Sequence, residues 1–305
     1  MAELRFDNRV AVITGGGRGL GRAYALLLAS RGAKIVVNDP GVNMKGDATD
    51  EGPADALVQE IRSLGGEAVA SLDSVATPEG GEAIVRTALD AFGSADILIH
   101  SAGNVRRGTV REISLQDFEL VLDVHLRGAF HVVRAAFPHM QDRGYGRIVL
   151  TGSINGLYGK SNNVNYSISK AGLMGLSNTV AIEGAASNIK SNLIIPGAVT
   201  RMSEGIDTSQ FPPMEPEAVA PAVAWLSHED CSISGEMIVA MGGRMARAFV
   251  AESPGVFHQD WSIESFGAEI AGIRRADSPL VFPPVPDGQL DHLLYGFDMI
   301  RKGEG

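Results

Sequence analysis

A tyrosine and a lysine lie four residues apart in the sequence Y-S-I-S-K, at Tyr166 and Lys170, and Ser153 precedes Tyr166 by thirteen positions. On a helix, residues four apart share one face, so the phenol and the ammonium point the same way. A free tyrosine has a pKa of about 10, and a neighbouring cation lowers that pKa by favouring the phenolate. A serine hydroxyl from a separate element can hold the substrate oxygen whose proton moves. These residues predict general acid–base chemistry, although Y-x-x-x-K alone also arises by chance on exposed helices.

A glycine-rich turn near the other end of the chain supports this interpretation. The β-branched run Val10 to Thr14 leads into Gly15 to Gly21, and the apolar stretch Ala23 to Ser30 follows with helical spacing. Strand, glycine turn and helix in this order are typical of a dinucleotide site. Glycines let the backbone approach a pyrophosphate, and a helix N-terminus supplies N–H groups and a favourable dipole. The predicted contacts from this turn are Gly15, Arg18, Gly19, Leu20 and Gly21.

The choice of dinucleotide depends on two residues of opposite charge. The second predicted strand, Ala33 to Asn38, ends at Asp39, where a carboxylate suits the ribose hydroxyls of NAD and repels the 2′-phosphate of NADP. Arg18 favours NADP, because a cation in the glycine turn can pair with that extra phosphate. We give Asp39 more weight and predict NAD. The alternative is an ordinary glycine turn beside a solvated aspartate.

Composition restricts the class of protein. With 305 residues, 45% of them hydrophobic, the chain can bury a large core. A net charge of −10 argues against nucleic acid or an anionic membrane as a partner. The single cysteine, Cys231, excludes an internal disulfide and a thiolate metal cluster, and no metal site is predicted. The sequence shows neither a membrane span nor a signal-peptide core, so we expect a cytoplasmic protein.

Strand-like and helix-like segments alternate along most of the chain, which predicts an α/β fold. The expected architecture is a Rossmann-type doubly wound parallel sheet with helices on both faces. Residues 1–248 form the expected catalytic domain, and the proline-rich residues 249–305 form a C-terminal extension. Further strands are expected at residues 67–71, 95–100, 147–151, 192–195 and 237–240, and helices at 79–92, from Ser114 through 137, at 163–187 and at 215–227.

Ligands of such sheets bind beyond the carboxyl ends of the strands. Six polar or turn residues follow predicted strands and therefore meet at that edge: Gly15, Asp39, Asp73, Ser101, Ser153 and Pro196. The sequence therefore predicts one site built from six separate segments.

With these motifs in place, the chain resembles the short-chain dehydrogenase/reductase family. The likeness is carried by T-G-x-x-x-G-x-G at Thr14 to Gly21, an N-A-G-like turn at Ser101, and P-G-x-x-T at Pro196, besides the tyrosine and lysine. The resemblance implies catalysis by Ser153, Tyr166 and Lys170. It also implies cofactor contacts from Asp73, Ser74, Ser101, Ala102, Gly103, Tyr166, Lys170, Pro196, Gly197 and Thr200.

The sequence between the motifs is similar to that of one sub-family, the (3R)-hydroxyacyl-CoA dehydrogenase domain of multifunctional β-oxidation enzymes. The matching stretches include V-H-L-R-G-A-F, Y-G-R-I-V-L-T-G-S and A-I-E-G-A-A-S-N-I-K-S-N. The resemblance implies NAD-dependent oxidation of a 3-hydroxyacyl thioester to the 3-keto form. Other secondary alcohols such as hydroxysteroids, an acyl-carrier-protein reductase using NADPH, and a non-catalytic dinucleotide-binding protein remain alternatives.

Two positions depart from the family pattern. His125 stands where the family usually has the asparagine of a proton relay, so we predict that its imidazole or local carbonyl holds the relay water; a packed helix residue is the alternative. His100 and Ser101 stand where two asparagines usually precede A-G, so any asparagine side-chain contact is lost.

Several surface features bear on substrate and assembly. Arg106 and Arg107, with Arg111 nearby, follow the fourth strand and are candidates for the phosphates of coenzyme A, or else a solvated loop. Residues 157–163 and 201–213 are expected to line the substrate pocket, the second as a lid. The extension is expected to wrap a subunit or to cover the acyl or steroid end of the substrate. Apolar positions within 121–137 and 173–182 suggest a homodimer or homotetramer.

Overall fold

The computed structural model describes residues 3–42, 52–200, 209 and 211–303. The chain divides into two compact units, Met1–Arg247 and Ala248–Gly305. The division falls one residue before the boundary expected from composition.

The first unit is built on an eight-stranded sheet in the order β3-β2-β1-β4-β5-β6-β7-β8. The strands from β1 to β7 pair in parallel, as their β-α alternation predicts. The strand order reverses between β1 and β4, which is where a doubly wound sheet opens a crevice for ligands. The bounds are β1 Val10–Thr14, β2 Lys34–Asn38, β3 Ala68–Ser71, β4 Ile97–His100, β5 Gly146–Thr151, β6 Ile189–Gly197, β7 Met237–Met241 and β8 Arg244–Ala248.

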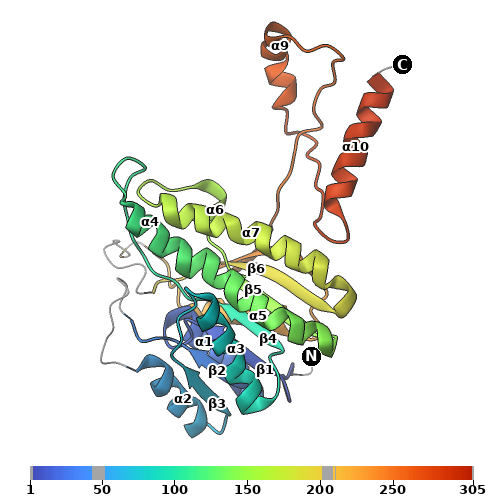
Figure 1. Ribbon diagram of the computed structural model, residues 1–305. Coiled ribbons are helices and arrows are strands. Elements are labelled where there is room, and N and C mark those ends of the chain that lie inside the picture. The colour runs from blue at the N-terminus through green and yellow to red at the C-terminus, as the bar shows by residue number, and fades with distance from the viewer. Residues whose placement is uncertain (1–2, 43–51, 201–208, 210, 304–305) are drawn as a thin grey trace. The chain divides into compact units, whose positions relative to one another are not determined.

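Helices cover both faces of this sheet (Figure 1). Helices α3, α5 and α7 pack together, and α1 packs with α2 and α8. The bounds are α1 Gly19–Ser30, α2 Pro53–Ser63, α3 Pro78–Phe92, α4 Leu115–Leu122, α5 Gly128–Arg143, α6 Ile154–Tyr158, α7 Val164–Gly184 and α8 Ala220–Ser227, with 3₁₀ turns at Ala185–Ser187 and Pro216–Ala218. None of the helices within the described ranges is both long and apolar enough to cross a bilayer.

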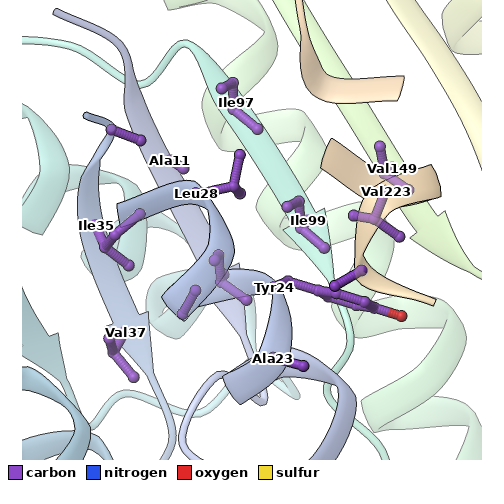
Figure 2. Close-up of a cluster of buried hydrophobic side chains, with 14 of the residues drawn as sticks. Ala11, Ala23, Tyr24, Leu28, Ile35, Val37, Ile97, Ile99, Val149 and Val223 are labelled. Atoms are coloured by element: carbon purple, nitrogen blue, oxygen red, sulfur yellow. The ribbon is translucent and has the colours of Figure 1, made fainter. Parts of the chain in front are cut away.

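Alternate residues of each strand face opposite helix layers. Ala11 and Ile13 of β1 and Ile35 of β2 belong to a buried cluster with Tyr24 and Leu28 of α1 (Figure 2). Val10 and Val12 of β1 and Val36 of β2 are also buried but lie outside that cluster. Burial on both faces explains why these strands read as continuous apolar runs.

The prediction for the sixth strand was wrong at both ends. β6 begins at Ile189 and continues through Pro196 and Gly197, which pair with β7. Its pairing with β5 ends at Ile194. Proline is tolerated there because the strand has lost one neighbour, so the missing N–H costs no ladder bond.

One strand was missed, and one helix is shorter than expected. β8 follows β7 after Gly242 and Gly243, which both have positive φ and form a two-residue turn. Its charged and half-exposed sequence gives no apolar signal, although the glycine pair is itself a hairpin signal. The predicted helix 215–227 is a 3₁₀ turn followed by α8, with Pro221 in the first turn of that helix.

The long helix expected from Ser114 contains a widened turn. Ser114 caps it as predicted, since its hydroxyl accepts from the Asp117 N–H. Between α4 and α5, residues Asp123–Arg127 form a π-helix. There the Gly128 N–H bonds the Asp123 carbonyl, five residues back, and not that of Val124. π turns of this kind occur often at functional sites.

The second unit contains α9, Ile263–Ile273, and α10, Gly288–Gly303. An isolated bridge joins Glu252 to Leu280, and the Tyr295 hydroxyl donates to the Pro254 carbonyl. Most large apolar side chains of the two helices are exposed.

Candidate active site

The glycine turn between β1 and α1 is shaped by close backbone contacts. Gly15 has φ +62°, and a Cβ there would lie 2.7 Å from the Ala102 Cα. A Cβ on Gly21 would lie 2.2 Å from the Gly15 carbonyl oxygen. Both positions therefore require glycine. The first turn of α1 has neither a capping hydrogen bond from its N-cap side chain nor an acidic residue, so its N–H groups are available to an anion.

Acidic and amide groups at the ends of β2 and β3 lie beside this turn. Asp39 is buried, and its carboxylate accepts from the Gly17 N–H at 3.2 Å and from the Gly41 N–H at 3.0 Å. The Asn38 side chain donates to the Asp73 carbonyl at 2.8 Å, which joins the two strand ends. The Asp73 carboxylate accepts from the Ser71 hydroxyl at 3.0 Å. Ser74 follows in the same loop.

The remaining predicted cofactor contacts lie at the same edge of the sheet. Ser101, Ala102 and Gly103 follow β4, and Pro196 and Gly197 end β6. Thr200 lies next to the glycine turn, since a Cβ on Gly19 would approach its Cγ2 to 3.5 Å. The geometry fits a dinucleotide: glycines leave space for a pyrophosphate, and a helix start faces it.

Ser153, Tyr166 and Lys170 come together beyond β5, from the N-cap of α6 and from α7. Ser153 is the N-cap of α6, its hydroxyl accepts from the Asn155 N–H at 3.1 Å, and it lies close enough to the Tyr166 phenol to lower the pKa of that group. Lys170 lies one turn beyond Tyr166 on α7, with Nζ 5.6 Å from the phenol ring centre. The ammonium donates to the Thr151 carbonyl at 2.5 Å. These three side chains can hold and move the proton of a hydroxyl group.

Burial governs the protonation of this group. It raises the pKa of Tyr166, while the neighbouring Ser153 hydroxyl lowers it by a smaller amount. It lowers the pKa of Lys170 to about 7. The sequence predicted a lowered tyrosine pKa from the lysine charge, but within the protein the desolvation of both groups is the larger effect. A cationic nicotinamide ring beside the phenol would favour the phenolate.

His125 lies in the π turn and is fully buried against the catalytic tyrosine. Its ring stands edge-to-face on the Tyr166 ring, with centroids 5.1 Å apart. Nε2 lies 2.9 Å from the Asn104 carbonyl and 3.1 Å from the Asn104 N–H. Burial, followed by the Lys170 charge, lowers the pKa of His125 well below its usual range. The ring is therefore neutral, and its contacts support a packing role more directly than the relay role predicted for it.

Sequence reasoning missed three residues that organise the site. The Thr14 hydroxyl accepts from the Ala102 N–H at 3.3 Å. Asn104 holds His125 through its backbone, and its amide donates to the Leu120 carbonyl. The buried Asn165 donates to the carbonyls of Arg106 and Asp117. Thr14 ends a predicted strand, so strand-end position was the available signal for it, whereas Asn104 lies four residues beyond the predicted strand 95–100.

Not every predicted residue turns toward the site. The Arg106 guanidinium pairs with Asp117 at 3.1 Å and bonds the Val105 carbonyl, with 17% of its side chain exposed. Residues 157–163 begin in α6, beside Ser153, whereas 201–208 and 210 of the proposed lid lie outside the described residues. A cavity of about 300 Å³ lined by Arg9, Tyr145 and His228 lies at the amino ends of the strands, away from this chemistry.

Comparison with known families identifies the class. Residues 9–210 match the family model of short chain dehydrogenases. The chain therefore belongs to the short-chain dehydrogenase family, whose members typically use NAD or NADP.

Individual relatives narrow this likeness. A peroxisomal multifunctional enzyme type 2 of Drosophila melanogaster is 48% identical over 83% of this chain and 42% of its own length. A peroxisomal hydratase-dehydrogenase-epimerase of Neurospora crassa is 42% identical over 99% of the chain and 34% of its own length. The chain thus spans less than half of these relatives. The crystal structure of a short chain dehydrogenase from Mycobacterium avium superposes with a TM-score of 0.78, at 34% identity, over 90% of this chain and 98% of that one.

Proposed function

We propose that the protein oxidises a secondary alcohol to a ketone with NAD, and that the alcohol is a (3R)-3-hydroxyacyl-CoA. The observation that carries the reaction type is the Ser153 hydroxyl beside the Tyr166 phenol with Lys170 one turn away, at the strand ends beside the glycine turn. Tyr166 takes the hydroxyl proton while a hydride leaves the same carbon, and Ser153 holds the oxygen. Bound nicotinamide supplies the hydride acceptor. Lys170 stabilises the phenolate and binds the ribose.

The multifunctional-enzyme relatives support the acyl-CoA substrate. Both relatives are peroxisomal enzymes by name, one of them a hydratase-dehydrogenase-epimerase, and both match this chain at more than 40% identity. The test follows NADH formation from (3R)-hydroxyacyl-CoAs, their (3S) isomers and free hydroxysteroids. Turnover confined to the (3R) thioesters supports the proposal. Turnover of free steroids alone would overturn the acyl-CoA assignment and leave a steroid dehydrogenase.

The preference for NAD rests on Asp39. Two backbone N–H groups hold its carboxylate beside Gly17, where it would repel a 2′-phosphate. Equilibrium titration should show NADH binding at least tenfold more tightly than NADPH, about 1.4 kcal/mol. Asp39→Ser should narrow that ratio, with Asp90→Ser on the outer helix α3 as a surface control. Tighter binding of NADPH by the wild type would favour Arg18 as the dominant residue and a reductase function.

Of Arg106 and Arg107, the two candidates for a contact with the phosphates of coenzyme A, the structure favours one. Arg107 is exposed, whereas only 17% of the Arg106 side chain is exposed, so Arg107 is the better candidate for a phosphate. Arg107→Ala should raise the KM for an acyl-CoA several-fold and leave the KM for the matching pantetheine thioester unchanged. An equal effect on both substrates would contradict a phosphate contact.

The second unit is proposed to cover the substrate or to contact a subunit. Its support is the exposed apolar surface of α9 and α10, which includes Ile263, Phe266, Leu294 and Phe297. Exposed Leu120, Phe130 and Ile182 on the catalytic unit support a homodimer or homotetramer. Light scattering of the full chain and of residues 1–247 tests both roles. An unchanged number of subunits with a raised KM indicates a substrate cover, whereas a smaller number of subunits indicates a subunit contact.

A further inference from the structure

His100 is a buried residue to which the reaction proposed above assigns no role. It ends β4, opposite Thr14 of β1 and Leu150 of β5, and none of its surface is exposed. Nδ1 lies 2.9 Å from the Thr14 hydroxyl oxygen. Nε2 makes no hydrogen bond to any described group. A polar atom buried in this way is costly unless a partner lies close by.

The contacts of Thr14 allow this ring to accept at Nδ1. The Thr14 hydroxyl oxygen accepts from the Ala102 N–H, and its own proton remains available to donate to Nδ1 of His100. A ring that accepts at Nδ1 carries its hydrogen on Nε2 when it is neutral. Burial and the Lys170 charge keep it neutral by lowering the pKa of His100 to about 3.

The His100 ring lies near the π turn of the catalytic side. The carbonyls of His125 and Val124 interact with the ring and oppose the fall of its pKa, although neither reaches hydrogen-bond geometry. In a regular α-helix the Gly128 N–H would bond the Val124 carbonyl. In the π turn it bonds the Asp123 carbonyl instead. His100 therefore presents a donor to a carbonyl that the widened turn deprives of its usual partner.

We infer that His100 is a positioning residue, which connects the dinucleotide turn at Thr14 to the π turn that carries His125. His125 packs on Tyr166 and binds the Asn104 backbone, so a shift of the π turn would move both the catalytic ring and the loop after β4. The inference rests on the proposed dehydrogenase function. It assigns to His100 the support of the π turn, through Nε2–H, and assigns it no proton transfer.

Two amide variants separate the two ring nitrogens. The glutamine of His100→Gln places an N–H near the position of Nε2, whereas the asparagine of His100→Asn reaches only the position of Nδ1 and Thr14. His100→Leu lacks both groups. Ile35→Val, in the cluster on the other face of the sheet, is the control for a mild loss of stability.

Steady-state oxidation of the best panel substrate, NADH binding and thermal unfolding are measured for each variant. His100→Gln should keep kcat within about threefold of wild type, while Asn and Leu should lower it by roughly ten- to a hundredfold. NADH affinity should change little in any variant, and Ile35→Val should keep full kcat. Retained kcat in the asparagine variant, or equal losses in the glutamine and asparagine variants, would overturn the inference. Should the leucine variant not fold, the amide pair decides.

Ring ¹⁵N NMR of labelled histidine gives a readout that needs no substrate. The His100 signal, assigned by its loss in His100→Gln, should show the neutral Nε2–H tautomer from pH 5 to 8. An Nδ1–H tautomer would overturn the inference. Absence of turnover in the wild type, with the expected tautomer present, would instead count against the proposed substrate.

Discussion

The cofactor half of this site depends on close approach of the backbone, whereas the catalytic half depends on side-chain groups. Around Gly15 and Gly21, backbone atoms approach so closely that a Cβ has no room, so function depends on these residues having no side chain. Around Tyr166 and Lys170, function depends on side-chain groups whose pKa values are set by burial. The cofactor half should therefore be sensitive to added atoms, and the catalytic half to removed ones. The predictions below test this difference.

Removal of the phenol should have the largest effect. Tyr166→Phe keeps the ring that packs on His125 but loses the group that takes the proton. We expect kcat to fall by about 10³-fold, with NADH affinity nearly unchanged. Near-normal turnover on a good substrate would contradict the assignment of Tyr166 and would place the base elsewhere in the catalytic half.

Loss of the serine hydroxyl should come next. Ser153 lowers the pKa of Tyr166 against the effect of burial, and it also caps α6. Ser153→Ala should lower kcat on the order of 10²-fold. It should also move the rise of kcat/KM for oxidation to higher pH, because the phenolate forms less readily. Ser153→Thr keeps the hydroxyl and should keep the profile; an unchanged pH profile in the alanine variant would rule out this coupling.

An added methyl group should damage the cofactor half. In Gly21→Ala the new Cβ meets the Gly15 carbonyl oxygen at 2.2 Å, so the turn must open. We expect NADH to bind about tenfold more weakly, or about 1.4 kcal/mol. Gly175→Ala is the matched control, because a Cβ there has no described atom within 4 Å and α7 gains helix propensity. Equal affinity in the two variants would remove the distinction between the halves.

The last prediction concerns stability in the absence of substrate. The pKa of Lys170 is about 7 in the folded protein against 10.5 for the free group. Between these values the unfolded chain binds a proton that the folded protein lacks, so the free energy of unfolding rises with pH. The contribution is about 1.4 kcal/mol per pH unit. Urea unfolding at pH 7.5, 8.5 and 9.5 should show this slope, and Lys170→Met should reduce it. An equal slope in the variant would mean that Lys170 is not desolvated.

Local pattern determined most of the fold. The runs Val10–Thr14 and Ile97–His100 are buried on both faces, so their continuous apolar sequence is enough to identify them as parallel strands. The glycine turn, the Y-x-x-x-K spacing and the Ser114 cap depend on neighbours within one or two turns, and such short-range chemistry is legible in the sequence. The strand segments that escaped prediction, β8 and the ends of β6, depend on which strands lie beside them.

Tertiary structure alone decided the electrostatics of the site. Its effects are the pairing of Arg106 with Asp117, the approach of His100 to the carbonyl of Val124 and the pKa values of Tyr166 and Lys170. Desolvation depends on how many atoms from distant segments surround a group, and residue type and spacing do not specify that number. The sequence by itself thus determined which chemical groups reach the strand ends. Packing decided which of them are charged there and which already have a partner.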